Sequence, residues 1–579
     1  MGLASRRILA ALLACAASGC AALPSGGSAA GWTLGPSREA EEYGDFLAAR
    51  YAGMIGDPAA AASFYRRAFE RESDDATLLE PAIFATLIAG EAETAAEVAT
   101  SASKSVAAAS PSAQLVLVVN DIARGKREAA LARLKTARLG AIHTDLVTFL
   151  SAWLTWPDDM DAALARLDVP DGRRMLVGEQ NYMKAFILLA ANRDKEAKAA
   201  FETASRYPVN SPAFLVAERA RLYASLGETA RARDEINAFV RASAATAETD
   251  AVLALIASGK PVTPLRLNMQ QGAALAMWLS SSGALTRASP ELATLRNALA
   301  LYADAGFAPA RLQLADALED QERYETAADV LADVAAVSPW YADAKLRQAK
   351  LLEELDRPAE ALAASVEATK TSRRRDILLG AGDIAREQKR HAEAGALYDE
   401  VVMADAARGK EDWRALYARA TVREQLGDWP GAETDLVRAL ELQPSSAELQ
   451  NFLGYNWVKR GEQVEQGMAL IRQAVAARPD RGYIIDSLGW AYFQLGEFEK
   501  AAELLERAIE LSPDDGEILR HLGDTYWRLG RQLEATFEWR RALALDPDEV
   551  ETEGLKARLA RGLPTGAPGA LAAAPQGRP

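Results

Sequence analysis

The chain has 579 residues, 49% of them hydrophobic and 25% charged, with a formal net charge of −15. This length exceeds what one compact core accommodates, so the chain folds either as several domains or as an array of repeats. The negative net charge repels phosphates and argues against nonspecific nucleic-acid binding. Two cysteines and three histidines supply too few ligands for a zinc centre, and no metal or other cofactor is expected.

Residues 1–19 have the composition of a secretory signal peptide. Arg6 and Arg7 form a basic head, and an apolar stretch follows over residues 8–14. This stretch is shorter than the roughly 20 residues that a membrane-spanning helix needs. The pattern therefore predicts export, with removal of the leader.

Small residues at 17–19 precede Cys20 and resemble the lipobox of bacterial lipoproteins. That resemblance implies cleavage before Cys20 and acylation of its thiol, followed by a flexible tether to residue 37. Cys15, which follows Leu-Leu-Ala, is a competing lipidation site. An ordinary cleaved signal without any lipid is the third alternative.

Helix-forming Ala, Leu, Glu and Arg dominate the chain after the tether. Residues 38–305 are expected to hold degenerate helical repeats, with the stretches 111–170 and 245–305 helical but out of register. Clearer repeats are expected over 306–405, and the most regular block over 406–560. The tail at 561–579 is rich in Pro, Gly and Ala and is expected to be disordered.

The block 406–560 contains an internal period. Prolines 479, 513 and 547 are 34 residues apart, and Pro444 precedes Pro479 by 35. Small residues, aromatics and turn glycines recur within that frame at Gly454, Gly489 and Gly523, at Trp457, Tyr492 and Tyr526, and at Gly461, Gly496 and Gly530. This pattern resembles the tetratricopeptide repeat (TPR) and predicts an all-α superhelical solenoid of about ten to twelve helical hairpins.

Each recurring residue has a physical role in such a hairpin. The small residue on the first helix lets the second helix approach closely. The turn glycine ends the first helix in a left-handed conformation, and the proline ends the second helix because it cannot continue the hydrogen-bond ladder. Stacking of the hairpins then supplies the apolar core that one hairpin lacks.

The first helices of TPR hairpins line a concave surface, where a partner protein or peptide is expected to bind. Aromatic rings there supply rigid apolar area, and polar groups hold peptide backbone or a terminal carboxylate. The alternative for Trp490 and Trp527 is packing between adjacent repeats. The candidate groove residues are Tyr417, Asn451, Tyr455, Lys459, Tyr483, Asp486, Trp490, Phe493, Arg520, Asp524, Trp527 and Arg528. This set does not reproduce the two-carboxylate clamp of chaperone-binding TPR domains.

Residues 451–455, 486–490, 522–527 and 539–543 together resemble the envelope TPR lipoproteins of proteobacteria. That resemblance implies a location on the periplasmic face of the envelope. Some members of the group are adaptors that bring substrates to a periplasmic carboxyl-terminal processing protease. Ala21, rather than Asp, follows Cys20, which favours the outer membrane.

Three functional hypotheses follow. The first is a noncatalytic adaptor that holds a partner protein or peptide, such as a periplasmic protease, at the membrane through its lipid anchor. The second is a structural subunit of an outer-membrane assembly or polysaccharide-secretion machine. The third is a hydrolase hidden in the off-period stretches, although no catalytic motif is present in the sequence.

Overall fold

The computed structural model describes residues 38–168, 177–207, 213–243, 245–281, 289–545 and 549–564. Within these ranges the regular structure is helical and no strand occurs, which confirms the all-α prediction. The signal peptide at 1–19, Cys20 with its tether to residue 37, and tail residues 565–579 lie outside these ranges. The predicted division of the helical region at residues 305 and 405 stays a prediction.

The helices up to residue 332 form the part of the chain that we call the body. They are α2 (Arg38–Met54), α3 (Pro58–Arg71), α4 (Ala76–Ile88), α5 (Ala92–Ser101), α6 (Lys104–Ala109), α7 (Pro111–Ala123), α8 (Arg127–Thr136), the short η1 (Ala141–His143), α9 (Thr144–Thr155), α10 (Met160–Leu167), α11 (Val177–Ala190), α12 (Asp194–Ala204), α13 (Ala213–Ser225), α14 (Thr229–Ala242), α15 (Ala247–Ala257), α16 (Met269–Ser281), α18 (Pro290–Ala303), α19 (Ala308–Glu319) and α20 (Tyr324–Ala332).

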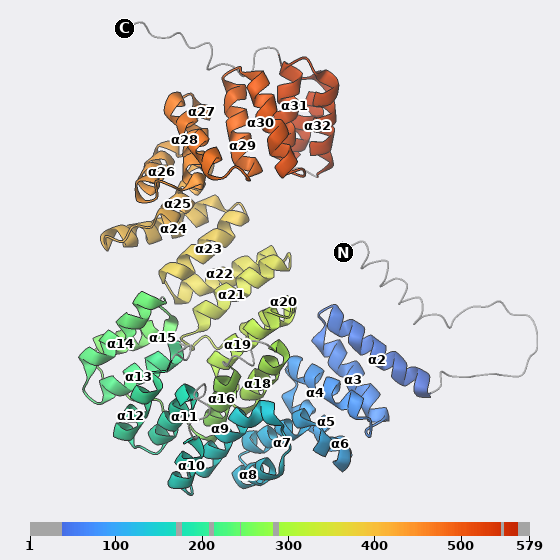
Figure 1. The fold of residues 1–579 in the computed structure, drawn as a ribbon, viewed down its shortest axis with the longest axis vertical. Coiled ribbons are helices and arrows are strands. Elements are labelled where there is room, and N and C mark those ends of the chain that lie inside the picture. Colours follow the sequence, from blue (N-terminus) through green and yellow to red (C-terminus); the bar gives the residue numbers. More distant parts are fainter. Residues whose placement is uncertain are drawn as a thin grey trace, which may run out of the picture.

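The remaining helices form the arm, which extends away from the body (Figure 1). They are α21 (Tyr341–Glu354), α22 (Pro358–Thr371), α23 (Arg375–Glu387), α24 (His391–Ala407), α25 (Trp413–Gln425), α26 (Trp429–Leu442), α27 (Ala447–Arg460), α28 (Val464–Ala477), α29 (Gly482–Gln494), α30 (Phe498–Leu511), α31 (Gly516–Arg528), α32 (Gln532–Ala544) and α33 (Glu549–Arg561).

Consecutive helices pack as hairpins, as expected of a solenoid. Among the described helices the pairs are α2/α3, α4/α5, α7/α8, α9/α10, α11/α12, α13/α14, α16/α18, α19/α20, α21/α22, α23/α24, α25/α26, α27/α28, α29/α30 and α31/α32. These fourteen pairs exceed the expected ten to twelve. The stretches 111–170 and 245–305, which lack the sequence register, contribute hairpins of their own.

The predicted close approach of paired helices is confirmed in the regular repeats. A Cβ added to Gly454 would lie 2.6 Å from the carbonyl oxygen of Gly467, and one on Gly489 would lie 2.8 Å from Leu505. At Gly523 the nearest atom would be 2.6 Å away, on Trp539. No side chain fits at these three positions without moving the second helix or the side chain facing it.

The body does not continue as an open solenoid, because α16 and α18 pack back onto helices far earlier in the chain (Figure 1). The indole Nε1 of Trp153 in α9 donates to the carbonyl oxygen of Met269 at 3.1 Å. The hydroxyl of Tyr302 in α18 donates to Oδ1 of Asn120 in α7 at 2.8 Å. One cluster of buried apolar side chains therefore runs from Ala68 to Leu351.

A buried arginine joins the same two parts of the body. Arg296 of α18 is 2% exposed, and its guanidinium donates to both carboxylate oxygens of Asp145 at 3.2 Å. It also donates to the carbonyl oxygens of Ser280 and, at 2.7 Å, of Ile142. A buried charge is tolerated only when it is paired and hydrogen-bonded, and these four bonds meet that requirement.

Candidate partner-binding groove

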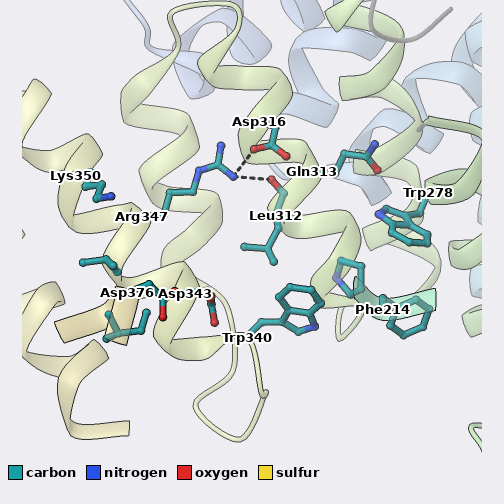
Figure 2. A pocket seen from close by; sticks show the side chains of 13 residues that line it. Phe214, Trp278, Leu312, Gln313, Asp316, Trp340, Asp343, Arg347, Lys350 and Asp376 are labelled. Carbon is teal, nitrogen blue, oxygen red and sulfur yellow. Dashed lines mark hydrogen bonds and ion pairs between the residues drawn. The ribbon is translucent and has the colours of Figure 1, made fainter. Parts of the chain in front are cut away.

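A cleft lies where the body meets the arm, and we call it the junction cleft (Figure 2). It has a volume of about 550 Å³. Phe214 of α13 and Trp278 of α16 line it from the body. Its other walls come from α19, α21 and α23, the first helices of three consecutive hairpins. These helices were expected to line the binding surface, but the cleft lies outside the block that the sequence singled out.

One wall of the junction cleft is aromatic. Phe214 and Trp278 line it and pack edge to face with each other and with Phe307, with ring centroids 5.6 to 5.8 Å apart. Trp340, partly exposed immediately before α21, lies near Phe214 and Trp278 (Figure 2). An apolar side chain that enters between these rings would bury its surface on both sides, which is the usual basis of an anchor pocket.

The other wall is charged, but most of its charges are already paired. Arg347 of α21 forms ion pairs with Asp316 (Figure 2) and with Glu319, the latter at 2.6 Å. Asp343 and Asp376 are both bridged by Arg374, which approaches Asp343 to 2.7 Å.

Lys350, one turn after Arg347, is exposed on the same wall. Within the part of the chain that the structure describes, the ammonium group of Lys350 makes no ion pair and no hydrogen bond. Lys350 is therefore the cation on this wall that is available to a ligand, because the neighbouring charges are paired with each other. The cleft is suited to a segment that carries an apolar side chain next to an acidic group.

The structure separates the residues predicted for the C-terminal groove into two groups. Tyr417, Tyr455, Lys459, Tyr483, Arg520, Trp527 and Arg528 are exposed or partly exposed, whereas Asn451, Asp486, Trp490, Phe493 and Asp524 are buried. Burial raises the pKa of the Tyr455 hydroxyl. The lysine Nζ of Lys459 lies 5.8 Å from the ring centroid of Tyr455. The assignment of this set to partner binding stays a prediction.

Trp490 packs between adjacent repeats, which was the alternative considered for it. Its ring stacks on Phe493 at 4.4 Å with an interplanar angle of 8°, and on His521 of the next repeat at 3.8 Å. It is 9% exposed, and Phe493 is fully buried. Trp490 therefore offers at most a ring edge to a partner, and Phe493 offers nothing in this arrangement.

A chain of hydrogen bonds crosses the same two repeats. Nδ1 of His521 lies 2.9 Å from Oδ1 of Asp486, and Nε2 of His521 lies 2.9 Å from a guanidinium nitrogen of Arg520. Because arginine only donates, Nε2 accepts and the ring proton lies on Nδ1, where it is donated to Asp486. Asp486 and His521 thus fix the direction of Arg520, and the predicted polar residue Asp486 has a structural role.

Helix α33 covers the C-terminal end of the predicted groove. Arg558 of α33 donates to Oδ1 of Asp524 at 2.8 Å, and the indole of Trp539 donates to the same carboxylate at 2.9 Å. Arg528 donates to the carbonyl oxygen of Pro564 at 3.1 Å. A Cβ on Gly562 would overlap the ring of Trp527. The chain itself therefore covers Trp527 and Arg528.

A second cavity of about 600 Å³ remains between α29, α31 and α33, and we call it the terminal pocket. Trp490, Phe493, Arg520 and Asp524 line it together with Arg558 and Arg561 of α33 and residues 562–564. Four of the twelve predicted groove residues thus meet in one cavity.

Sequence reasoning missed the junction cleft and the contribution of α33 for different reasons. The helix positions used for the regular block, counted in this repeat from the small residue Ala349, select Asp343, Leu346 and Lys350 of the cleft but neither Trp340 nor Arg347. That signal was present but was applied only to the most regular repeats. Helix α33 follows the last repeat, and no period places it against α31.

The described residues contain neither a candidate membrane-spanning helix nor a candidate metal site. No helix there combines the length and apolarity needed to cross a bilayer. No three side chains among its His, Cys, Asp and Glu residues gather as a metal site would require. Cys20 lies outside the described residues, so its lipidation stays a prediction.

Family models match the chain in its second half. A tetratricopeptide-repeat model matches residues 312–372, 346–411 and 417–481, and a TPR-repeat model matches residues 489–530. A TPR repeat-containing protein of Pseudomonas aeruginosa is 32% identical over 91 residues, which are 16% of this chain and 15% of that protein. The match thus spans a small part of the relative's length.

The chain also matches several solved structures, all at low sequence identity. A tetratricopeptide repeat protein from Parabacteroides merdae has a TM-score of 0.39 at 16% identity, covering 43% of this chain and 96% of its own. The APC/C heterotetramer Cut9–Hcn1 gives a TM-score of 0.36 at 15% identity, with coverage of 92% and 97%. YrrB, a TPR protein described as having an unusual peptide-binding site, gives 0.25 at 23% identity, with coverage of 31% and 90%.

Proposed function

We propose that this chain, which carries tetratricopeptide repeats between residues 312 and 530, is a noncatalytic scaffold that binds a partner protein or peptide. The observation that carries the proposal is the junction cleft. It is an open cavity with one aromatic wall and an available lysine, built by first helices of consecutive repeats. Most other charges that line it are already paired within the chain. The cleft therefore offers the apolar anchor site and the directional charge that a binding groove needs.

Substitutions in the cleft test this function. We expect Trp340→Ala combined with Lys350→Glu to lower capture of the bound partner by at least about tenfold, since an aromatic anchor contributes about 2 kcal/mol or more. The measurement is crosslinking in cells, followed by quantitative mass spectrometry of the proteins captured by the full chain.

Matched controls come from elsewhere on the surface. Phe537→Ala removes an exposed aromatic ring from α32, and Lys410→Glu reverses an exposed charge after α24; both should leave capture unchanged. If the double variant keeps its melting temperature and still captures the same partner at the same level, the cleft is not the binding site. Cofractionation with a large membrane complex, insensitive to the cleft variants, would favour the structural-subunit alternative.

We further propose that the scaffold is exported and held at the periplasmic face of the envelope by a lipid on Cys20. The basic head, the apolar stretch and the small residues before Cys20 support this proposal. In this setting a periplasmic processing protease and its substrates are candidate partners. Lipid-anchored display would keep the bound partner close to the outer membrane.

Metabolic labelling with radioactive palmitate tests the anchor. Wild-type protein and Cys15→Ser should incorporate the label, and Cys20→Ser should not. Label that persists in Cys20→Ser but disappears in Cys15→Ser would move the anchor to Cys15, and an unlabelled wild-type protein would exclude a lipid anchor. Separation of inner and outer membranes then locates the labelled protein.

A further inference from the structure

A further cavity lies at the start of the body, and we call it the N-terminal groove. It has a volume of about 270 Å³ and is formed by α2, α3, α4 and Arg323, the residue before α20. The start of α20 lies near these first helices (Figure 1). Met54, Tyr65 and Phe84 are among its apolar lining residues. The groove therefore belongs to the part of the body that directly follows the predicted tether.

Two arginines of the N-terminal groove have no partner within the described residues. Arg50 of α2 is exposed and Arg323 is partly buried, and neither side chain makes an ion pair or a hydrogen bond there. Burial lowers the pKa of the Arg323 guanidinium, and Glu291 only partly opposes this shift. A partly buried cation without a counterion carries an uncompensated desolvation cost. An anion bound in the groove would offset that cost.

The acidic residues around the groove are engaged within the chain. Asp45 of α2 pairs with Arg71 at 2.5 Å, and Glu91, just before α5, lies 3.4 Å from Arg66. Asp57 accepts a hydrogen bond from the backbone at the start of α3 and caps that helix. Among the described residues that line the groove, none is acidic. The unpaired charge in the groove is therefore positive, although the net charge of the chain is −15.

Helix α2 carries an exposed stripe that continues the groove, and we call it the α2 stripe. It consists of Tyr43, Leu47, Arg50 and Met54, which follow each other at intervals of four, three and four residues. This spacing places the four side chains on one face of the helix. Tyr43 is 66% exposed, Leu47 49% and Met54 79%. The stripe therefore combines apolar surface with one of the two unpaired arginines.

Exposed apolar side chains are concentrated at this end of the body. Of the six large ones in the described part of the body, four lie between residues 43 and 55, and the others are Ile142 and Tyr207. The terminal repeat of a solenoid normally has a polar outer face, because that face meets water. Helix α2 departs from this rule, so its stripe is expected to be covered in the cell.

The chemistry and the position of the α2 stripe favour a bilayer surface as its occupant. A helix face that combines apolar side chains with arginine is the pattern of helices that lie in the membrane interface. Cys20, the proposed lipid site, is 18 residues before Arg38, the first residue of α2. A flexible chain of that length spans about 20–25 Å on average. A lipid on Cys20 would therefore hold α2 close to the membrane surface.

We propose that the N-terminal groove and the α2 stripe dock against a bilayer that contains anionic phospholipid. Arg50 and Arg323 bind the headgroup phosphate, and Leu47 and Met54 enter the apolar part of the interface. This inference goes beyond the proposed scaffold function and adds a second membrane contact to the proposed lipid on Cys20. The second contact would hold the body in one orientation, which a flexible tether alone does not provide.

Vesicle cosedimentation tests the docking, with the full chain carrying Cys15→Ser and Cys20→Ser so that no lipid is attached. Vesicles of phosphatidylcholine alone are compared with vesicles that contain about 30% phosphatidylglycerol. We expect Arg50→Gln combined with Arg323→Gln to lower binding to the anionic vesicles at least about tenfold, since each basic residue near an anionic surface contributes roughly fivefold. Leu47→Ser combined with Met54→Ser should also lower binding, because apolar contact with the interface is lost.

Matched controls lie on the arm. Arg408→Gln combined with Arg540→Gln removes two exposed arginines, and Met403→Ser combined with Leu511→Ser removes two exposed apolar side chains. Both pairs should leave vesicle binding unchanged. Residues 1–37 are identical in all of these proteins, so differences between them report the described surface. The two groove arginines lack partners there, so unchanged melting is expected and a loss of binding is not a folding defect.

Two outcomes would overturn the proposal. The first is equal binding of the parent protein and the double arginine variant to the anionic vesicles. The second is capture of a protein partner through Arg50 and Arg323 without vesicle binding, which would assign the groove to a peptide. Neither outcome decides the proposals made above, because palmitate labelling reports the anchor at Cys20 and capture through Trp340 reports the scaffold function.

Discussion

At the scale of single residues, the closed body is packed so tightly that replacing one glycine hydrogen with a methyl group would create a steric clash. Gly272 of α16 lies against the indole of Trp153, and a Cβ there would lie 1.6 Å from Cε2 of that ring. Trp153 is 1% exposed and is held by its hydrogen bond to Met269. The ring therefore cannot move aside without losing both its packing and its bond partner.

Gly272→Ala is expected to destabilise the protein, although alanine favours a helix by about 1 kcal/mol over glycine. Overpacking at this contact costs about 1–3 kcal/mol or more, so the melting temperature should fall. Gly395→Ala is the matched control, because its Cβ would meet Val422 at an ordinary 3.4 Å, and its melting temperature should hold or rise. A Gly272→Ala variant that melts like the wild type would contradict the packing seen here.

At the scale of elements, the body and the arm meet through α15, α21 and α23. Arg374, just before α23, contacts Asp343 of α21 and Asp376 of α23, and its Nε lies 4.0 Å from Asp250 of α15. Glu248, at the start of α15, is buried beside this group. Desolvation raises the pKa of Glu248 to about 8, while Arg374 opposes the shift. The carboxyl group is therefore protonated in the folded protein near neutral pH.

The raised pKa makes the stability of this junction depend on pH. Below the ordinary carboxyl pKa of 4.5, Glu248 is protonated in both the folded and the unfolded chain. Its contribution to the free energy of unfolding is then at its maximum. As the pH rises from 4.5 to about 8, the unfolded chain releases this proton while the folded chain keeps it. The free energy of unfolding therefore falls over this pH range. Glu248→Gln removes this dependence.

The measurement is the difference in melting temperature between Glu248→Gln and wild type. We expect this difference to become more positive from pH 5 to pH 8.5, because the neutral glutamine carries no ionisation cost. Glu354→Gln, an exposed site at the end of α21, should give a constant difference. A flat profile for Glu248→Gln would contradict a protonated carboxyl group at this position.

At the scale of the whole molecule, two kinds of helical packing coexist. One apolar cluster joins helices of the body from α3 onward and includes Leu351 of α21, and Arg296 links residues about 150 positions apart. In the arm, the buried side chains divide into several smaller clusters, each shared by neighbouring hairpins. A repeat array of that kind transmits contacts only between neighbours. The junction cleft lies where the two kinds of packing meet.

The sequence by itself determined the class of fold and the local geometry of the regular repeats. Prolines 444, 479 and 513 follow the ends of α26, α28 and α30, as the period predicts. Gly496 and Gly530 adopt φ +78° at the turns between paired helices. These features depend on neighbours within one hairpin, and the sequence spacing records them directly.

Several of the expected repeats lack a glycine at the turn between their two helices. Asn192, Glu322, Asp356 and Lys389 adopt the same left-handed conformation with φ between 57° and 61°. Packing of the two helices around each turn holds these residues in a conformation that L-residues otherwise disfavour. Their hairpins are therefore present in the structure without the glycine that marks them in the sequence.

Only the tertiary structure decided where the candidate binding surfaces lie. The period cannot reveal that α16 and α18 return to α7 and α9, that Trp278 and Trp340 line one cleft, or that Arg561 of α33 lines the same cavity as Arg520. These long-range contacts depend on how the small rotations between neighbouring hairpins add up along the chain. They also depend on how surfaces that are distant in sequence fit together. The spacing of residues in the sequence determines the geometry of each hairpin, whereas the arrangement of all the hairpins in space determines the clefts between them.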